Sequence, residues 1–400
     1  MSNTIAPWLV VLPAGHWQVS GIRAAIEQGI QVLAFDGDPN AKGLEIATKS
    51  AVVNIKDSKA VLDAIESSGI TPQGAVSFAS EVGMPAVAAV REYYNLVGAN
   101  TELTHLLTNK MYQRDFLQKK GVQGPKKWKI FTSLSMAKAC IKDVGFPCIV
   151  KPVDSAGSRG VTKVETSDEV ESAARHALEA SQTGVALVET FMEGTEYAVE
   201  TFGDGNTIHV LAVTEKKKVP GTKGTVAQEL STPSDETRSM IVSDISVAAL
   251  QAFGYMNGPG HTEVILDKYN RPGLVETAGR GGGFMVFERM VEKASGFDIV
   301  TATALQSVGI MTPVHVKKKH SVVLRFIVSK EGVVRNISGI KEASTIPGVE
   351  VGSLVTVGQL VSNVQGDGDR LAYILSEGDT LKAAKSAANH AETLIEITVE

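Results

Sequence analysis

The stretch of sequence that decides the fold is residues 260–283, which read GHTEVILDKYNRPGLVETAGRGGG. Two apolar-rich segments are separated there by the polar turn Lys268–Pro272, a pattern that predicts a β-hairpin. Pairing across the turn sets Glu263 of the first strand close to Glu276 of the second, on one face. His261 lies on the same strand face as Glu263. It either orients substrate or a ligand, or it is a hydrogen-bonded structural histidine.

Two like charges in core-like strands are costly unless a cation accompanies them. The hard oxygen ligands of Glu263 and Glu276 favour Mg²⁺ or Mn²⁺. The alternative is a twisted hairpin with a solvated acidic edge, which fits poorly with the apolar flanks and with Gly281–Gly283. Arg280 and the bare backbone around Gly282 suit a polyphosphate or a carboxylate.

A second signal lies upstream in residues 151–161, which read KPVDSAGSRGV. A predicted strand over 146–152 delivers Lys151, and a loop rich in glycine and serine follows at once. The backbone N–H groups and hydroxyls of such a loop suit a phosphate, to which the lysine adds a point charge. A hairpin turn beside an exposed lysine is the alternative. The loop residues assigned to phosphate are Ser155, Ala156, Gly157, Ser158 and Gly160.

A third signal is the segment 188–200, VETFMEGTEYAVE. Glu189 and Glu196 lie where two strand-like flanks meet a short linker that ends at Gly194. A carboxylate in that position is able to accept hydrogen bonds from an amino group or from ribose hydroxyls. Solvated surface glutamates are the alternative.

The first hundred residues alternate between short apolar strands and helices. Strands are predicted over 8–12, 31–35, 52–55 and 74–78, and helices over 21–27 and 59–67. This alternation predicts a small, doubly wound domain with a parallel sheet over residues 1–100. Its first turn, Pro13–Gly21, lacks the G-x-G-x-x-G spacing, which argues against a nicotinamide-dependent dehydrogenase.

Three further regions follow this domain in the sequence. Residues 101–187 combine a helical stretch up to Lys120 with a small α/β unit. Residues 188–310 mix strands and helices and contain the hairpin. Residues 311–400 are rich in β-branched residues and close on a helix over 379–394. The sequence therefore predicts an α/β (α+β) protein with several domains.

Composition excludes several classes of protein. The 39 basic and 44 acidic residues give a formal net charge of −5, which argues against a nucleic-acid partner. No apolar run reaches the roughly 18 residues of a membrane span, and the two cysteines form no disulfide framework. The N-terminus is typical of a buried strand and not of a signal peptide. We therefore expect a cytoplasmic protein without a membrane partner.

Taken in order, these motifs resemble the ATP-grasp superfamily over nearly the whole chain. The likeness is to its carboxylate–amine ligase branch, which includes the L-amino acid ligases and the large chain of carbamoyl-phosphate synthase. The resemblance implies a pre-ATP-grasp domain over 1–100, linker helices and a lid subdomain over 101–187, and a metal and nucleotide subdomain over 188–310. A small β-rich C-terminal subdomain over 311–400 completes the expected fold.

The resemblance also implies roles for single residues. Lys110 and Lys151 reach the ATP phosphates, and Arg280 stabilises the transferring phosphoryl group. The remaining roles are the adenine-side acid Glu189, the ribose acid Glu196, main-chain contacts of Phe191 and Met192 to adenine, the metal ligands Glu263 and Glu276, and the substrate residues His261, Glu229, Lys216 and Gly282. One position departs from the family, because Ala278 stands where an Asn usually completes the metal site.

The implied activity is ATP-dependent joining of a small carboxylate to an amine through an acyl-phosphate, with ADP and phosphate released. ATP and Mg²⁺ (or Mn²⁺) are the implied cofactors, and a homodimer is the implied assembly. One alternative is carboxylation or formyl transfer on a purine-like precursor. Another is a regulatory nucleotide-binding protein that has lost turnover, for which Ala278 is the only support.

Overall fold

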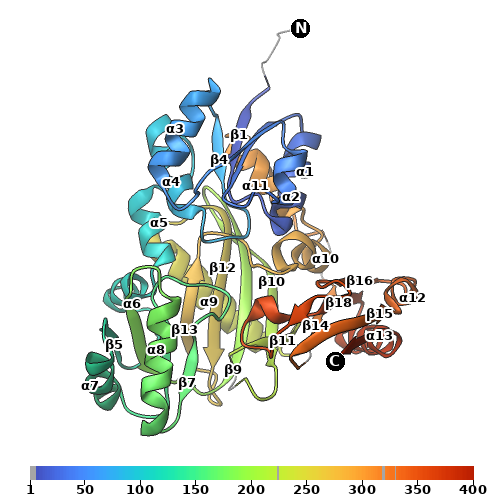
Figure 1. Ribbon diagram of the computed structural model, residues 1–400. Coiled ribbons are helices and arrows are strands. Elements are labelled where there is room, and N and C mark those ends of the chain that lie inside the picture. The colour runs from blue at the N-terminus through green and yellow to red at the C-terminus, as the bar shows by residue number, and fades with distance from the viewer. Residues whose placement is uncertain (1–5, 223–224, 318–319, 329) are drawn as a thin grey trace.

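The computed structural model describes residues 6–222, 225–317, 320–328 and 330–400. Within these ranges the strands form four sheets, three of them antiparallel and the N-terminal one parallel. Figure 1 shows the N-terminal domain at the top, the lid at the lower left and the C-terminal strands at the right of a central sheet. Across those same ranges, no helix combines the length and hydropathy needed to cross a membrane.

The N-terminal domain is the doubly wound parallel sheet that the sequence predicts. Its strand order is β3-β2-β1-β4, with β1 (Trp8–Val11), β2 (Gln31–Asp36), β3 (Lys49–Val52) and β4 (Gly74–Val76). Its helices are α1 (Val19–Glu27), α2 (Lys42–Ile46), α3 (Ser58–Ser68) and α4 (Met84–Tyr94). β3 starts earlier than the expected 52–55, because the exposed segment 49–52 pairs with β2 and the apolar residues beyond it fold into a loop.

The helical stretch that follows is two helices and not one. They are α5 (Thr101–Thr108) and α6 (Lys110–Lys119), with an extended residue, Asn109, between them. The Asn109 side chain accepts hydrogen bonds from the N–H groups of Met111 and Tyr112 and so caps α6. This break places Lys110 in the first turn of α6, where its N–H donates to the carbonyl of Val153 at 2.8 Å.

The lid is a four-stranded sheet covered by two helices. Its strand order is β5-β8-β6-β7, with β5 (Trp128–Phe131), β6 (Cys148–Pro152), β7 (Thr162–Val164) and β8 (Ala186–Thr190). The helices α7 (Leu134–Val144) and α8 (Val170–Ala180) pack on it around a core that includes Phe131, Ile141 and Val188. β8 pairs with β5 and β6, so the lid runs past the expected boundary at residue 187.

The central sheet has the order β13-β12-β9-β10-β11-β14-β18-β16. Its strands are β9 (Thr195–Asp204), β10 (Ile208–Lys218), β11 (Ala227–Ser231), β12 (Asn257–Leu266), β13 (Pro272–Ala278), β14 (Ser321–Ile327), β16 (Val349–Ser353) and β18 (Ala372–Gly378). The helix α9 (Glu236–Phe253) packs against β9, β10, β12 and β13. Three of the strands come from the C-terminal region, so that region extends the central sheet.

The C-terminal region is β-rich, as the sequence predicts. Besides β14, β16 and β18 it contains a small sheet of order β17-β15-β19, with β15 (Gly332–Ser338), β17 (Leu360–Val361) and β19 (Glu396–Val399). Its helices are α12 (Ile340–Ala343) and α13 (Leu381–Leu394). Ala384, Ala388 and Ala391 of α13 are fully buried, which fixes this helix on the sheet.

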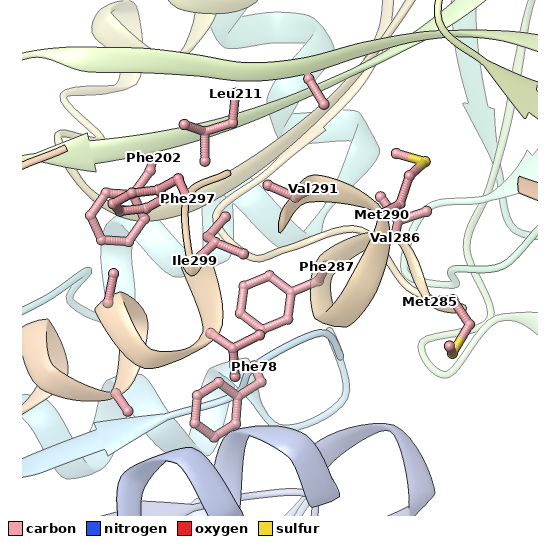
Figure 2. Packing of buried hydrophobic residues seen from close by; sticks show 14 of the residues in the cluster. Phe78, Phe202, Leu211, Met285, Val286, Phe287, Met290, Val291, Phe297 and Ile299 are labelled. Atoms are coloured by element: carbon pink, nitrogen blue, oxygen red, sulfur yellow. The ribbon is translucent and has the colours of Figure 1, made fainter. Parts of the chain in front are cut away.

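One hydrophobic core joins the N-terminal domain to the central sheet (Figure 2). It includes the helical segments Val286–Met290, α10 (Val291–Ser295) and α11 (Ile299–Ser307). Phe78, just after β4, faces Phe287 with ring centroids 6.2 Å apart (Figure 2). This contact places the loop after β4 beside the glycine segment that follows β13.

Gly281→Ala is expected to destabilise the protein by about 1–3 kcal/mol, as overpacking of a core does. A Cβ at Gly281 would lie 2.1 Å from Cδ2 of Phe287, whose ring is fixed in this core. Chemical unfolding measures the loss. The matched control is Gly283→Ala, whose Cβ would meet its nearest atom at 4.0 Å. An equal loss in both variants contradicts the expectation.

Candidate active site

A cavity of about 590 Å³ lies where the N-terminal domain, the lid, the central sheet and the C-terminal region meet. Most of the residues singled out from the sequence line it. They are Lys110, Lys151, Ser155, Ala156, Gly157, Ser158, Glu189, Phe191, Met192, Glu196, Lys216, His261, Glu263, Glu276 and Arg280. Three others, Gly160, Glu229 and Gly282, are not among the described lining residues.

Glu263 and Glu276 are direct cross-strand partners on β12 and β13, as the hairpin predicts. Lys216 forms an ion pair with Glu263, and Lys110 forms one with Glu276 at 3.0 Å. Burial alone would raise the pKa of Glu263, but Lys216 and His261 hold it well below its usual range. Burial alone would also raise the pKa of Glu276, but the neighbouring Lys110 outweighs it, and the pKa of Glu276 is lowered. The neighbouring cations therefore favour the ionised form of both carboxylates.

These two carboxylates suit a hard divalent cation that draws its remaining ligands from outside the protein. Among the described residues, no group of three or more His, Cys, Asp or Glu side chains is arranged to hold a metal by itself. Mg²⁺ commonly binds through one or two carboxylates plus substrate phosphates and waters. The two lysine ammonium groups neutralise the pair in the structure described here, so the site already accommodates positive charge.

Lys216 links the carboxylate pair to Glu196. Its Nζ lies 3.0 Å from Oε1 of Glu196, and Lys218 reaches the other carboxylate oxygen at 2.8 Å. Burial lowers the pKa of Lys216, but Glu263 and Glu196 outweigh it and raise the pKa above its ordinary value. Lys216 is therefore a fixed positive charge between a predicted metal ligand and the predicted ribose acid.

Lys151 does not stand free at the end of β6. Its Nζ lies 2.6 Å from Oε1 of Glu189, and Arg114 of α6 contacts the other carboxylate oxygen at 3.0 Å. Arg114 also donates to the carbonyl of Val275, which ties α6 to β13. With 3% of its side chain exposed, Glu189 orients Lys151, and its role as the adenine-side acid stays a prediction. The linker backbone at Phe191 remains open to the cavity.

Glu189→Gln is expected to lower the free energy of unfolding by about 3–5 kcal/mol, because removing one partner leaves buried charges uncompensated. Lys151 and Arg114 both lose their ion-pair partner in this variant. Urea unfolding of purified protein measures the change. Glu193→Gln is the matched control, since this glutamate is exposed on the same linker. The expectation fails when both variants unfold at the same urea concentration.

The glycine and serine loop after β6 is folded tightly over the cavity. Gly157, Ser158 and Gly160 have φ values of 68°, 61° and 74°, in the left-handed region that favours glycine. The hydroxyl of Ser158 donates to the carbonyl of Thr225 at 2.9 Å. A Cβ on Gly160 would lie 2.6 Å from that of Ala180. Gly160 thus packs closely against α8, and its contact with phosphate stays a prediction.

Arg280 reaches back toward the N-terminal domain. Its Nη1 donates to the carbonyl of Gly281 at 2.8 Å, and its Nη2 pairs with Glu81. Glu81 lies in the loop after β4 and also lines the cavity. The sequence reasoning missed Glu81, although a polar residue just beyond a parallel strand is a signal of a binding site.

A second buried acid missed by that reasoning is Glu200 of β9. It pairs with Nδ1 of His261 and accepts the N–H of Gly282 at 3.1 Å. Burial alone lowers the pKa of His261, but Glu200 and Glu263 raise it to about 9. Glu200 thus holds the N–H of Gly282, and the contact of Gly282 with substrate stays a prediction. In register, Ala278 lies opposite His261.

Glu229, a substrate residue by the family likeness, is held by neighbouring cations. Its Oε2 lies 2.8 Å from Nε of Arg325 on β14, and its other oxygen lies 3.8 Å from Lys385. Its side chain pairs with the neighbouring strand and with α13, and its contact with substrate stays a prediction. Its neighbours Ala227 and Leu230 do line the cavity.

Comparison with known proteins agrees with this arrangement. Residues 144–288 match the model of the ATP-grasp domain, and residues 325–400 match L-amino acid ligase C-terminal domain 2. The chain thus contains an ATP-grasp domain. More particularly, its ATP-grasp domain is followed by an L-amino acid ligase C-terminal domain.

Curated relatives that match part of this chain include proteins named as ligases and as formyltransferases. Phosphoribosylamine–glycine ligase of Pyrococcus abyssi is 30% identical over 125 residues, which cover 30% of this chain and 28% of that protein. The chain spans less than half the length of the phosphoribosylamine–glycine ligases it matches.

Two solved structures share the fold over nearly the whole chain. L-amino acid ligase from Bacillus licheniformis superposes with a TM-score of 0.84 at 20% identity, covering 99% of each chain. The biotin carboxylase domain dimer of Hydrogenobacter thermophilus 2-oxoglutarate carboxylase, in complex with MgADP, ADP and bicarbonate, has a TM-score of 0.75 at 18% identity. That alignment covers 98% of this chain and 90% of the other. At these identities the likeness concerns the fold alone.

Proposed function

We propose that this protein is an ATP-dependent ligase that activates a small carboxylate as an acyl-phosphate and couples it to an amine. The observation that carries the proposal is the cross-strand carboxylate pair Glu263 and Glu276, which shares one cavity with Lys110, Lys151 and Arg280. Such a cluster suits the transfer of a phosphoryl group between two anions. Relatives named as ligases support the same reaction class.

The nucleotide lies, in this proposal, between the lid and the central sheet. Apolar walls for adenine come from Ile149, Ile265 and Val275, with main-chain groups of the linker at its edge. Glu196 accepts from the ribose hydroxyls. The phosphates lie under the loop of residues 155–158, near the ammonium groups of the two predicted lysines.

Glu263 and Glu276 are the residues that would hold Mg²⁺ or Mn²⁺. When bound, the ion supplies positive charge that the triphosphate shares with these two carboxylates. Lys110 already lies beside Glu276 and donates to the carbonyl of Ser155 at 2.8 Å. It therefore connects the carboxylate pair to the phosphate loop.

The reaction proceeds by two displacements. An oxygen of the substrate carboxylate attacks the γ-phosphorus, the bond from phosphorus to the β,γ-bridging oxygen breaks, and ADP leaves. The amine nitrogen then attacks the acyl carbon, the carbon–oxygen bond to phosphate breaks, and the amine loses a proton as phosphate departs. Arg280 stabilises the transferring phosphoryl group. The loop of residues 155–158 excludes water, which would hydrolyse the acyl-phosphate.

We further propose a cytoplasmic homodimer with small-molecule substrates only. Relatives of this fold support the assembly, because one of them was solved as a dimer. Gel filtration with light scattering tests it, and a monomer at micromolar concentration contradicts it.

The test of the function is phosphate release from ATP and Mg²⁺ across an array of small carboxylates crossed with amines. Release that requires both partners supports the ligase. Phosphate release with a purine-like precursor and bicarbonate or formate assigns the carboxylating or formylating alternative. Tight ATP binding without release under any pairing contradicts the proposal and favours a regulatory nucleotide-binding protein.

A further inference from the structure

A second cavity, of about 260 Å³, lies beside the active-site cavity. Leu274 of β13 lines the second cavity, and its neighbour Val275 lines the active-site cavity. Successive residues of a strand point to opposite faces, so β13 separates the two cavities. The other walls of the second cavity are helix α6, the segment 121–125 and Trp128 of the lid strand β5.

This cavity lies at one of the two chain connections between the lid and the rest of the protein. The segment 121–127 joins α6 to β5, and the carbonyl of Gln123 accepts the N–H of Leu274 at 2.8 Å. Leu117 and Leu274 belong to one buried core of the central region, whereas Trp128 belongs to the lid. A ligand between them therefore contacts both parts of the molecule.

Arg114 of α6 is the side chain that stands between the two cavities. It lines the second cavity, whereas its ion-pair partner Glu189 lines the first. Nε contacts Glu189 at 3.0 Å, and Nη2 donates to the carbonyl of Val275. Nη1 makes no hydrogen bond to the described residues, although the side chain is only 4% exposed. A buried donor in this state gains from an acceptor that a ligand supplies.

The ion-pair cluster around Arg114 carries more positive than negative charge. Arg114 and Lys151 share the single carboxylate of Glu189. Burial lowers the pKa of Lys151, and Glu189 offsets only part of this effect because Arg114 opposes it. An anion in the second cavity would compensate the remaining charge.

The chain around the segment 121–125 is basic. Four exposed lysines flank this segment in the sequence, namely Lys119, Lys120, Lys126 and Lys127. Of these, Lys119 alone forms an ion pair with a described residue, Asp115. A local excess of positive charge raises the concentration of anionic ligands near a cavity.

The remaining lining suits a small, flat ring. The indole N–H of Trp128 donates to Oε1 of Gln118 at 3.2 Å, which leaves the amide NH₂ of Gln118 to donate to a ligand. Trp128, Leu117 and Pro125 supply apolar surface on which a ring packs. A cavity of about 260 Å³ is small for a ligand site, so the ligand is small as well.

We infer that the second cavity binds an aromatic monocarboxylate and that this ligand weakens the binding of ATP. Its carboxylate accepts hydrogen bonds from Arg114 and Gln118, and its ring packs against Trp128. The inference goes beyond the proposed function, because it uses the nucleotide site but no step of the reaction.

The coupling between the two cavities runs through the shared carboxylate. A ligand carboxylate on Arg114 replaces part of its contact with Glu189, so Glu189 holds Lys151 more tightly and away from the phosphates. Two anions on either side of one buried wall also repel each other. By linkage, ATP weakens the binding of the ligand by the same factor.

The first test is calorimetry of the purified protein without nucleotide. Benzoate and indole-3-acetate are titrated to about 10 mM, because a ligand of this size reaches only modest affinity. At least one of them is expected to bind. Its uncharged amide, benzamide or indole-3-acetamide, keeps the ring and is expected to bind at least about 10-fold more weakly. No binding of either carboxylate overturns the inference.

A charge variant locates the bound carboxylate. Gln118→Glu adds a negative charge at the exposed edge of the second cavity, so it is expected to weaken binding at least about 10-fold and to keep the fold. The matched control is Gln28→Glu, the same change at an exposed position of the N-terminal domain, which is expected to bind as the wild type does. Undiminished binding to Gln118→Glu overturns the inference, because the carboxylate is then held elsewhere, for example as a substrate in the active site.

The second test measures the coupling with a non-hydrolysable ATP analogue and Mg²⁺, so it needs no turnover. A saturating concentration of the bound carboxylate is expected to raise the Kd of the analogue about 5- to 10-fold in the wild type and to leave it unchanged in Gln118→Glu. An unchanged or lowered Kd in the wild type overturns the proposed inhibition. An analogue that fails to bind at all contradicts the proposed function and the inhibition together, whereas the titration without nucleotide still decides the carboxylate site.

Discussion

Glu276→Gln is expected to lower turnover about 100-fold or more, the scale on which one lost electrostatic partner acts in a preorganised site. The amide keeps the size of the side chain but removes the charge that pairs with Lys110 at 3.0 Å. It also removes one of the two cross-strand carboxylates that would hold the metal. Steady-state phosphate release at saturating ATP measures the loss.

The matched control for this variant is Glu215→Gln. Glu215 lies on β10 of the same central sheet but is exposed. We expect it to keep wild-type turnover, while circular dichroism shows that Glu276→Gln remains folded. A folded Glu276→Gln protein with wild-type turnover would contradict the assignment of Glu276 as a metal ligand.

Arg280→Gln is the second variant with a large expected effect, a loss of turnover of about 100- to 1000-fold. Arg280 is 7% exposed and lines the cavity, so its charge acts in a largely water-excluded site. Because its role is proposed for the transition state, kcat should fall while the KM for ATP changes little. Initial rates over a matrix of ATP concentrations separate the two parameters.

This variant also leaves Glu81 without its ion-pair partner, so a folding control is needed. The double variant Glu81→Gln/Arg280→Gln removes both charges and is expected to regain stability but not turnover. Recovery of turnover in the double variant would show that Arg280 acts only as a structural partner of Glu81.

The parts of the site that could be predicted from the sequence are those set by local geometry. A short turn allows few registers between two strands, and the register Glu263–Glu276 follows from it. In the same way, Lys151 and the loop behind it follow from a strand that ends in a run of small residues.

The parts that could not be predicted are set by contacts between distant segments. Arg114 and Glu189 are 75 residues apart, and Glu81 and Arg280 are 199 residues apart. The ion pair of Glu229 with Arg325 of β14 could not be predicted either, because nothing local says which neighbour its side chain meets.

The central claim is that a carboxylate oxygen attacks the γ-phosphorus of ATP. The most direct test labels the substrate carboxylate with ¹⁸O and analyses the released phosphate by mass spectrometry. The account predicts that one labelled oxygen passes from each carboxylate into inorganic phosphate, with ADP as the second product. Unlabelled phosphate, or label found in AMP, would contradict it.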